Sequence, residues 1–257
     1  MMVTGGRVAA LSIGIPLALG VVGWQAFNMV GFMAQTSEHF EESYAWHGGE
    51  IAVDVSSGSV RVVAGDSATV GVSYTEHYQL KKPTASVTPT GTGMLIKARC
   101  PGGVFSNNCS INYVLTVPSS AQMAIRTGDG GVRVSDLRGD LSLDTGSGGV
   151  SLANLSGDVQ VKTGDGGVRG ENLRSGVLEA RTGNGGVNLT WSKQPGNVVV
   201  RTGDGGVRIT VPNGTGPYHV DVSTGDGGKH VSVATDPAAK PTITAHTGNG
   251  GVVIGYP

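Results

Sequence analysis

A glycine-rich string recurs along this chain, and its residue types are those of a ligand-binding loop. The string RTGDGGVRV at residues 126–134 returns as KTGDGGVRG, RTGNGGVNL and RTGDGGVRI. Backbone N–H groups of such loops can hold phosphate, and Asp carboxylates can bind calcium. A phosphate loop opens a helix, whereas each copy here opens an alternating apolar run typical of a strand, with no GKS or GKT. We therefore exclude a nucleotide loop.

Calcium is the second chemistry that this string could support. The residue two positions after the Thr varies among Asp, Asn and Ser, and the calcium-roll pattern GGxGxDxUx is absent. Short polar residues that interchange in this way are typical of turns, where they accept local backbone bonds and, as Asp or Asn, adopt left-handed geometry. We expect a structural corner with neither a metal nor another cofactor. The column contains Asp129, Ser147, Asp165, Asn184, Asp204, Asp226 and Asn249.

Within the corner, the charge at this position correlates with the charge four residues later. An acid at this position is accompanied by Arg or His four residues later, as with Asp129 and Arg133 or Asp165 and Arg169. In the first five copies the charged pair occurs in every second copy, which would keep like charges about 10 Å apart. We expect each acid to be neutralised by its partner. A Thr ladder bonded within the corner is favoured over an ice-binding face, because each copy has only one Thr, in inward parity.

Seven copies define an internal repeat with spacings of 18, 18, 19, 20, 22 and 23 residues. Apolar residues stand four and two positions before each Thr and five and seven after it, with Gly170 and Lys229 as exceptions. Alternation with period two predicts two short strands per copy, each with one inward face. Stacking the copies buries those faces and predicts an all-β fold, a β-solenoid of 18–23-residue coils. The Thr positions are Thr127, Thr145, Thr163, Thr182, Thr202, Thr224 and Thr247.

The N-terminal region adds a membrane signal and more strands. Residues 8–33 lack charge and are preceded by Arg7, which predicts a transmembrane anchor with the rest of the chain outside the cytoplasm; a cleaved signal peptide is the alternative. Residues 1–7 would be cytoplasmic and 34–50 a juxtamembrane linker. Residues 51–118 would form a strand-rich portion that includes one degenerate coil and a cap, and 119–257 the repeat array.

Two cysteines support an exterior location. Cys100 and Cys109 flank a turn-rich segment between two runs that resemble strands, so we expect a disulfide across a hairpin. Two free buried thiols are the alternative. The net charge of −1 gives no indication of nucleic-acid binding.

The segment LTVPSSAQMAIRTGDGGVRV, residues 115–134, together with the anchor and the coils, resembles the bacterial putative-adhesin family of β-helical cell-surface proteins. The resemblance extends from Ile51 to Ile254. It implies a surface or envelope location and supplies no catalytic residues. The coils here are shorter and richer in Gly than is usual for that family.

No catalytic constellation is present: HExxH, GxSxG and metal-ligand spacings of His are all absent. We therefore expect a non-enzymatic surface protein that binds or scaffolds at the cell envelope. An outward column, with Arg126, Lys162, Arg181 and Arg201 as its cations, is the candidate face for an acidic envelope glycopolymer; an ordinary solvated face is the alternative. Two other functions stay open, a sensor or scaffold of envelope-stress signalling that binds a membrane protein, and a β-helical enzyme acting on polysaccharide.

Overall fold

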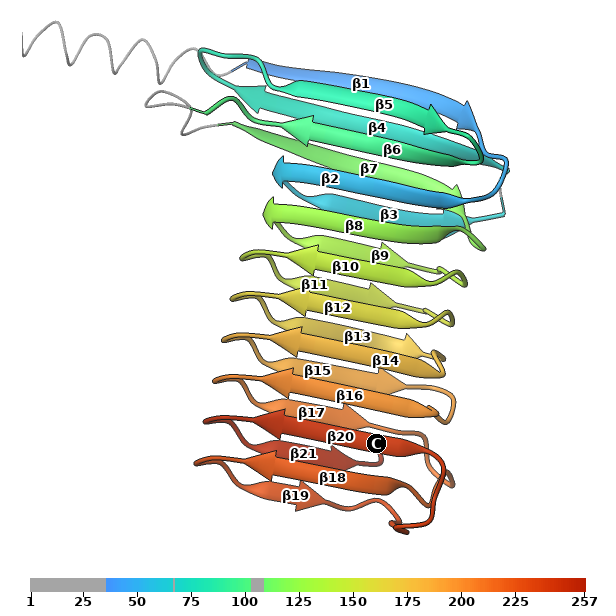
Figure 1. Cartoon of the computed structure of the whole chain (residues 1–257), viewed down its shortest axis with the longest axis vertical. Coiled ribbons are helices and arrows are strands. Elements are labelled where there is room, and N and C mark those ends of the chain that lie inside the picture. The colour runs from blue at the N-terminus through green and yellow to red at the C-terminus, as the bar shows by residue number, and fades with distance from the viewer. Residues whose placement is uncertain (1–35, 67, 103–108) are drawn as a thin grey trace, which may run out of the picture.

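Two long sheets stacked face to face form the body of the protein (Figure 1). The computed structural model describes residues 36–66, 68–102 and 109–257. Within these ranges no helix is both long and apolar enough to cross a membrane. The anchor expected at residues 8–33 lies outside the described residues.

In the described part of the chain, sheet 1 has eleven strands in the order β1-β4-β7-β3-β9-β11-β13-β15-β17-β21-β19. These strands are β1 (Thr36–Ala45), β4 (Thr69–Tyr78), β7 (Ser110–Pro118), β3 (Val60–Gly65), β9 (Val132–Ser135), β11 (Val150–Ala153), β13 (Val168–Leu173), β15 (Val187–Trp191), β17 (Val207–Thr210), β21 (Val252–Gly255) and β19 (Lys229–Val231).

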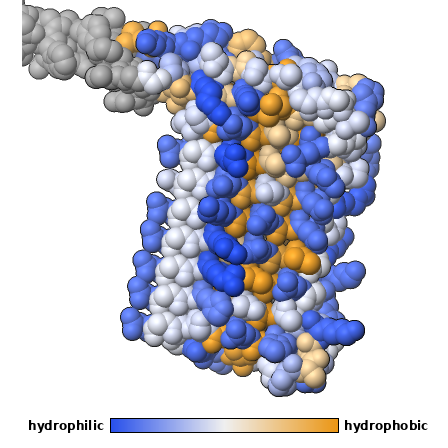
Figure 2. All heavy atoms as spheres, viewed as in Figure 1, coloured by the Kyte–Doolittle hydropathy of each residue, from blue (hydrophilic) through white to orange (hydrophobic). Residues whose placement is uncertain are grey.

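Sheet 2, within the described residues, has ten strands in the order β18-β20-β16-β14-β12-β10-β8-β2-β6-β5. Its outward face has a hydrophilic column running along the stack (Figure 2). These strands are β18 (His219–Thr224), β20 (Thr242–Thr247), β16 (Asn197–Thr202), β14 (Val177–Thr182), β12 (Val159–Thr163), β10 (Leu141–Thr145), β8 (Gln122–Asp129), β2 (Glu50–Ser57), β6 (Gly93–Arg99) and β5 (Thr84–Thr90).

Each coil contributes one strand to each sheet, and equivalent residues stack in parallel register. Thr145 pairs with Thr127 and Thr163, and Val150 pairs with Val132 and Val168. The structure thus confirms an all-β, solenoid-like stack with the strand faces predicted from the period-two pattern. The degenerate coil is also in register, since Ile51 pairs with Met123 and Val60 with Val132.

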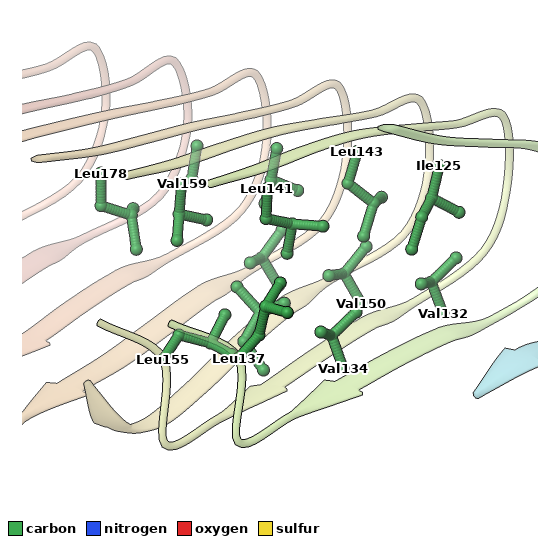
Figure 3. Close-up of a cluster of buried hydrophobic side chains, with 14 of the residues drawn as sticks. Ile125, Val132, Val134, Leu137, Leu141, Leu143, Val150, Leu155, Val159 and Leu178 are labelled. Carbon is green, nitrogen blue, oxygen red and sulfur yellow. The ribbon is translucent and has the colours of Figure 1, made fainter. Parts of the chain in front are cut away.

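The core is a continuous apolar layer between the sheets (Figure 3). Val132, Val134, Leu141 and Leu143 are each at most 2% exposed. Full burial of each such side chain contributes about 1.5–3 kcal/mol. The exception at Gly170 has a packing explanation: a Cβ there would come within 2.8 Å of side-chain atoms of Leu173 and Leu189, so the neighbouring leucines occupy its space.

The last two coils are exchanged in space relative to their order in the chain. The coil of β20 and β21 lies directly against β16 and β17, and the coil of β18 and β19 forms the end of the stack. This position explains the second exception, Lys229. At the end of the stack its side chain is exposed, and its Nζ donates to the Val222 carbonyl at 3.0 Å, whereas the apolar Val252 takes the interior position.

The N-terminal end has a similar exchange and a cap. The coil of β6 and β7 lies beyond that of β2 and β3, which is held between β6/β7 and β8/β9. Strands β1 and β4 on sheet 1 and β5 on sheet 2 run antiparallel to their neighbours and cover this end. The expectation of a linker at 34–50 is wrong for most of its length, because residues 36–45 pair with β4 along their whole length.

Candidate functional site: the glycine corner and the charged columns

The corner between the two strands of a coil is held by its buried Thr. The Thr202 hydroxyl donates to the carbonyl of Gly185 in the adjacent coil at 2.9 Å and accepts the N–H of Gly205 in its own coil at 3.2 Å. Thr182 and Thr247 make the corresponding bonds. The predicted Thr ladder is therefore confirmed, and burial of these Thr residues excludes an ice-binding face built from them.

The glycines of the corner are required by close stacking. A Cβ on the first or second glycine, as at Gly203 or Gly205, would lie within 3 Å of a carbonyl oxygen in the adjacent coil, a distance that real Cβ atoms do not adopt.

The expected left-handed geometry for the Asp and Asn of this corner is wrong. Left-handed φ occurs instead at Asp136, Asn154 and Asn172, in the opposite corner of their coils.

The acidic column of the corner bonds along the stack. Asn184 donates from Nδ2 to Asp165 Oδ1 at 2.6 Å, and Asn249 donates to Asp204 Oδ1 at 2.5 Å. The predicted neutralisation of Asp165 by Arg169 is wrong: in the described chain these two residues form no ion pair, and Arg169 pairs with Glu171 at 2.6 Å. Amide donors from adjacent coils therefore satisfy part of the acid column.

The exchange of the last two coils completes the alternation of this column. An acid stands at every second level and a neutral polar residue at every level between, so like charges remain about 10 Å apart. The spatial order is Ser57, Asp129, Ser147, Asp165, Asn184, Asp204, Asn249 and Asp226.

The predicted basic column lies on the outward face of sheet 2 and is visible as a hydrophilic line in Figure 2. The register brings Lys162, Arg181 and Arg201 onto three adjacent strands. Arg126 is separated from them by Asp144, which pairs in register with both Arg126 and Lys162. The four predicted residues therefore share one line, but only three of them are contiguous.

A carboxylate that sequence reasoning missed lies beside this column. Glu179 Oε1 is 2.5 Å from Arg181 Nη2 and 3.7 Å from Arg201 Nη1. Three cations and one carboxylate leave this part of the face net positive, and in the described structure Lys162 has no ion-pair partner. Glu179 could have been found from its parity, because it lies two residues before Arg181 and therefore on the same outward face.

At the N-terminal end of the column the charges are paired. Arg99 donates to the Asp54 carboxylate, and this hydrogen bond is the main reason that the pKa of Asp54 lies below its usual value. Asp54 also pairs in register with Arg126. Arg126 is thus between two acidic neighbours, which weakens it as a partner for an anionic polymer.

The predicted disulfide is present, but it does not cross a hairpin as expected, because β6 belongs to sheet 2 and β7 to sheet 1 and these two strands do not pair. Cys100 and Cys109 are bonded, with their Cα atoms 5.8 Å apart. It closes the connection between β6 and β7, where the later coils have their stacked glycines, and the Cys100 N–H donates to Ser56 Oγ at 2.9 Å. A covalent bond thus holds the corner that lacks the glycine string.

Comparisons with known proteins found a matching family and several similar solved structures. Residues 96–254 match the family described as Toastrack DUF4097. A putative cell adhesion protein from Clostridium sporogenes is 11% identical, with a TM-score of 0.40 and coverage of 86% of this chain and 100% of that one. A putative adhesin from Bacteroides fragilis is 12% identical, with a TM-score of 0.43 and coverage of 86% and 97%. A putative lipid binding protein from Parabacteroides distasonis is 13% identical, with a TM-score of 0.40 and the same coverages as the second protein. No curated protein matches.

Proposed function

Because this chain belongs to the Toastrack DUF4097 family, we propose that it is a non-enzymatic, adhesin-like protein that binds an acidic glycopolymer at the cell envelope. The observation that supports this is the contiguous basic run of Lys162, Arg181 and Arg201 on sheet 2. Parallel strands set these cations about 4.8 Å apart along a rigid stack. That spacing suits a polymer with an anionic group on every residue.

The location follows from the same proposal. The apolar segment at residues 8–33 would anchor the protein, with the solenoid outside the cytoplasm. The disulfide between Cys100 and Cys109 is compatible with an oxidising exterior. In that position the outward face of sheet 2 would be accessible to envelope polymer.

Binding of polygalacturonate, which has a uronate on every sugar, tests this function. We expect Lys162→Ser and Arg201→Ser in the full chain to weaken binding and to make it less dependent on salt, because each removes one screened charge interaction. The matched controls are Lys193→Ser and Arg174→Ser, which remove exposed cations from the opposite edge of the stack. Equal binding by all four variants would show that the column is ordinary solvated surface.

A further inference from the structure

A groove runs along the outward face of sheet 1. A hollow of about 670 Å³ extends over β13, β15, β17 and β21, and another of about 220 Å³ extends over β3, β9 and β11. Both are lined by Gly149, so they meet at that coil. The groove therefore follows the stack axis across most of the coils.

One side of the groove is a column in which arginines alternate with neutral polar residues from β9 to β17; at its N-terminal end Arg61 on β3 adds a further cation directly beside Arg133. Arg133, Arg169 and Arg208 stand on every second coil, with Ser151 and Asn188 on the coils between them. All five line the hollows. Because strands are about 4.8 Å apart, successive arginines are about 10 Å apart.

The arginines of this column differ in whether they have an ion-pair partner. Arg169 is held by Glu171 at 2.6 Å, whereas in the described chain Arg133 and Arg208 have no carboxylate within ion-pair distance. The acids on the same coils belong to the corner column, where Asp204 accepts an amide hydrogen bond from Asn249. Arg133 and Arg208 are therefore available to an external anion.

The floor of the groove has no side chains, although close packing does not require glycine in every coil. It consists of the third glycine of each corner, as at Gly149 and Gly206, where a Cβ would meet its nearest backbone oxygen at 3.8 and 3.6 Å, ordinary contact distances. Neither residue has a positive φ. The second glycine of the corner, in contrast, tolerates no side chain. Packing would admit alanine at Gly149 and Gly206, whereas Gly167 is tighter, with a Cβ 3.2 Å from the Gly186 carbonyl oxygen; glycine at all of these positions keeps the groove open.

We propose that this groove binds a linear acidic polysaccharide with a carboxylate on every second sugar. The apolar faces of extended sugar rings would lie on the glycine floor. Carboxylates two disaccharides apart would reach Arg133 and Arg208, which lie four strands or about 20 Å apart, because a bidentate guanidinium bond suits a carboxylate. Ser151 and Asn188 can both donate and accept, which suits the hydroxyls of the intervening neutral sugars. From Arg133 to Arg208 the alternation of the wall thus matches the alternation of the ligand, in contrast to the three adjacent cations of sheet 2.

Hyaluronate, which alternates uronate with neutral sugar, is the probe for the full chain. We expect binding that weakens roughly tenfold in Arg208→Gln, because one charge-assisted hydrogen-bonding group is lost. Gly206→Leu should abolish binding by filling the groove. The matched controls, Arg174→Gln and Gly228→Leu, lie outside the hollows and should bind as the unmodified chain does; Gly228 has open space around its Cβ position.

Thermal unfolding of each variant separates blocked binding from misfolding. If the leucine variant fails to fold, Arg133→Gln and Gly206→Ala replace the first two variants. Absence of hyaluronate binding, or equal binding of carboxyl-reduced hyaluronate, would overturn the proposal. So would hyaluronate binding that Arg201→Ser weakens and Arg208→Gln does not, since that result places the ligand on sheet 2. Polygalacturonate binding through Arg201 is tested by a separate experiment, so failure of one proposal can be distinguished from failure of the other.

Discussion

Asn249 donates a hydrogen bond to Asp204 over 2.5 Å, although 45 residues separate them along the chain. The bond exists because the C-terminal coil is inserted between the coils of Asp204 and Asp226. It places a neutral amide between two acids that would otherwise lie on adjacent strands.

Asn249→Asp should destabilise the stack by up to about 1 kcal/mol, because three acids would then face one another at adjacent levels. The loss should shrink in high salt, which screens exposed charges. Chemical denaturation at two salt concentrations measures it. Asp226→Asn, at the end of the same column, is the control and should not destabilise; a salt-independent loss in Asn249→Asp would contradict the electrostatic account.

Val168→Asp should be far more damaging than Arg201→Ser. Val168 is 2% exposed and stacks between Val150 and Val187, so an aspartate there would be buried without a partner at a cost of several kcal/mol. The Arg201 side chain is 47% exposed and lies 3.7 Å from Glu179, and its loss should cost less than about 1 kcal/mol. Equilibrium unfolding compares them, and equal stability would mean that the strand faces are reversed.

Two adjacent glycines should respond differently to alanine. In Gly205→Ala the new methyl group would clash with a backbone carbonyl of the adjacent coil, so the stack should lose several kcal/mol or fail to fold. Gly206→Ala has room for the methyl group and should change stability by less than about 1 kcal/mol, in the stabilising direction if the alanine restricts the unfolded chain. Thermal melts of the pair test this, and a similar loss in both would refute the distinction between packing glycines and groove glycines.

Glu76 in the cap should give a stability change that depends on pH. Burial is the main cause that raises the pKa of this carboxyl above its ordinary value of 4.5, and the Lys82 Nζ at 3.6 Å opposes the shift. A raised folded-state pKa means that stability is lost as pH rises from the unfolded value through the folded one. Glu76→Gln should therefore stabilise the protein at about pH 7 and have little effect at about pH 4.

Glu38 provides the opposite control for this prediction. Hydrogen bonds from Lys82 and Tyr78 lower the pKa of Glu38, so its ionised form supports the fold above its unfolded pKa. Glu38→Gln should destabilise at neutral pH, and the difference should fade on acidification. Unfolding by denaturant across this pH range checks both variants; a gain from Glu38→Gln at neutral pH would show that the assigned charge interactions are wrong.

The sequence alone determined the repeat and its faces, because strand geometry sends alternate side chains to opposite sides whatever the neighbours are. Val132 and Val134 could be assigned inward and Arg126 outward from parity, and Thr202 could be assigned to the corner from its place before the glycines. These are local properties of each coil.

Only the tertiary structure decided which coil lies beside which. The connection 211–218, between β17 and β18, passes over one coil, and the connection 232–241 then returns to the coil that was passed over, so the coil of Lys229 lies at the exposed end and the apolar coil of Val252 inside. This arrangement follows from burial across the whole stack, because leaving a lysine in water costs less free energy than burying it. The ladder from Asn249 to Asp204, the carboxylate of Glu179 between two arginines and the groove over Gly206 all depend on contacts between coils, which no single repeat contains.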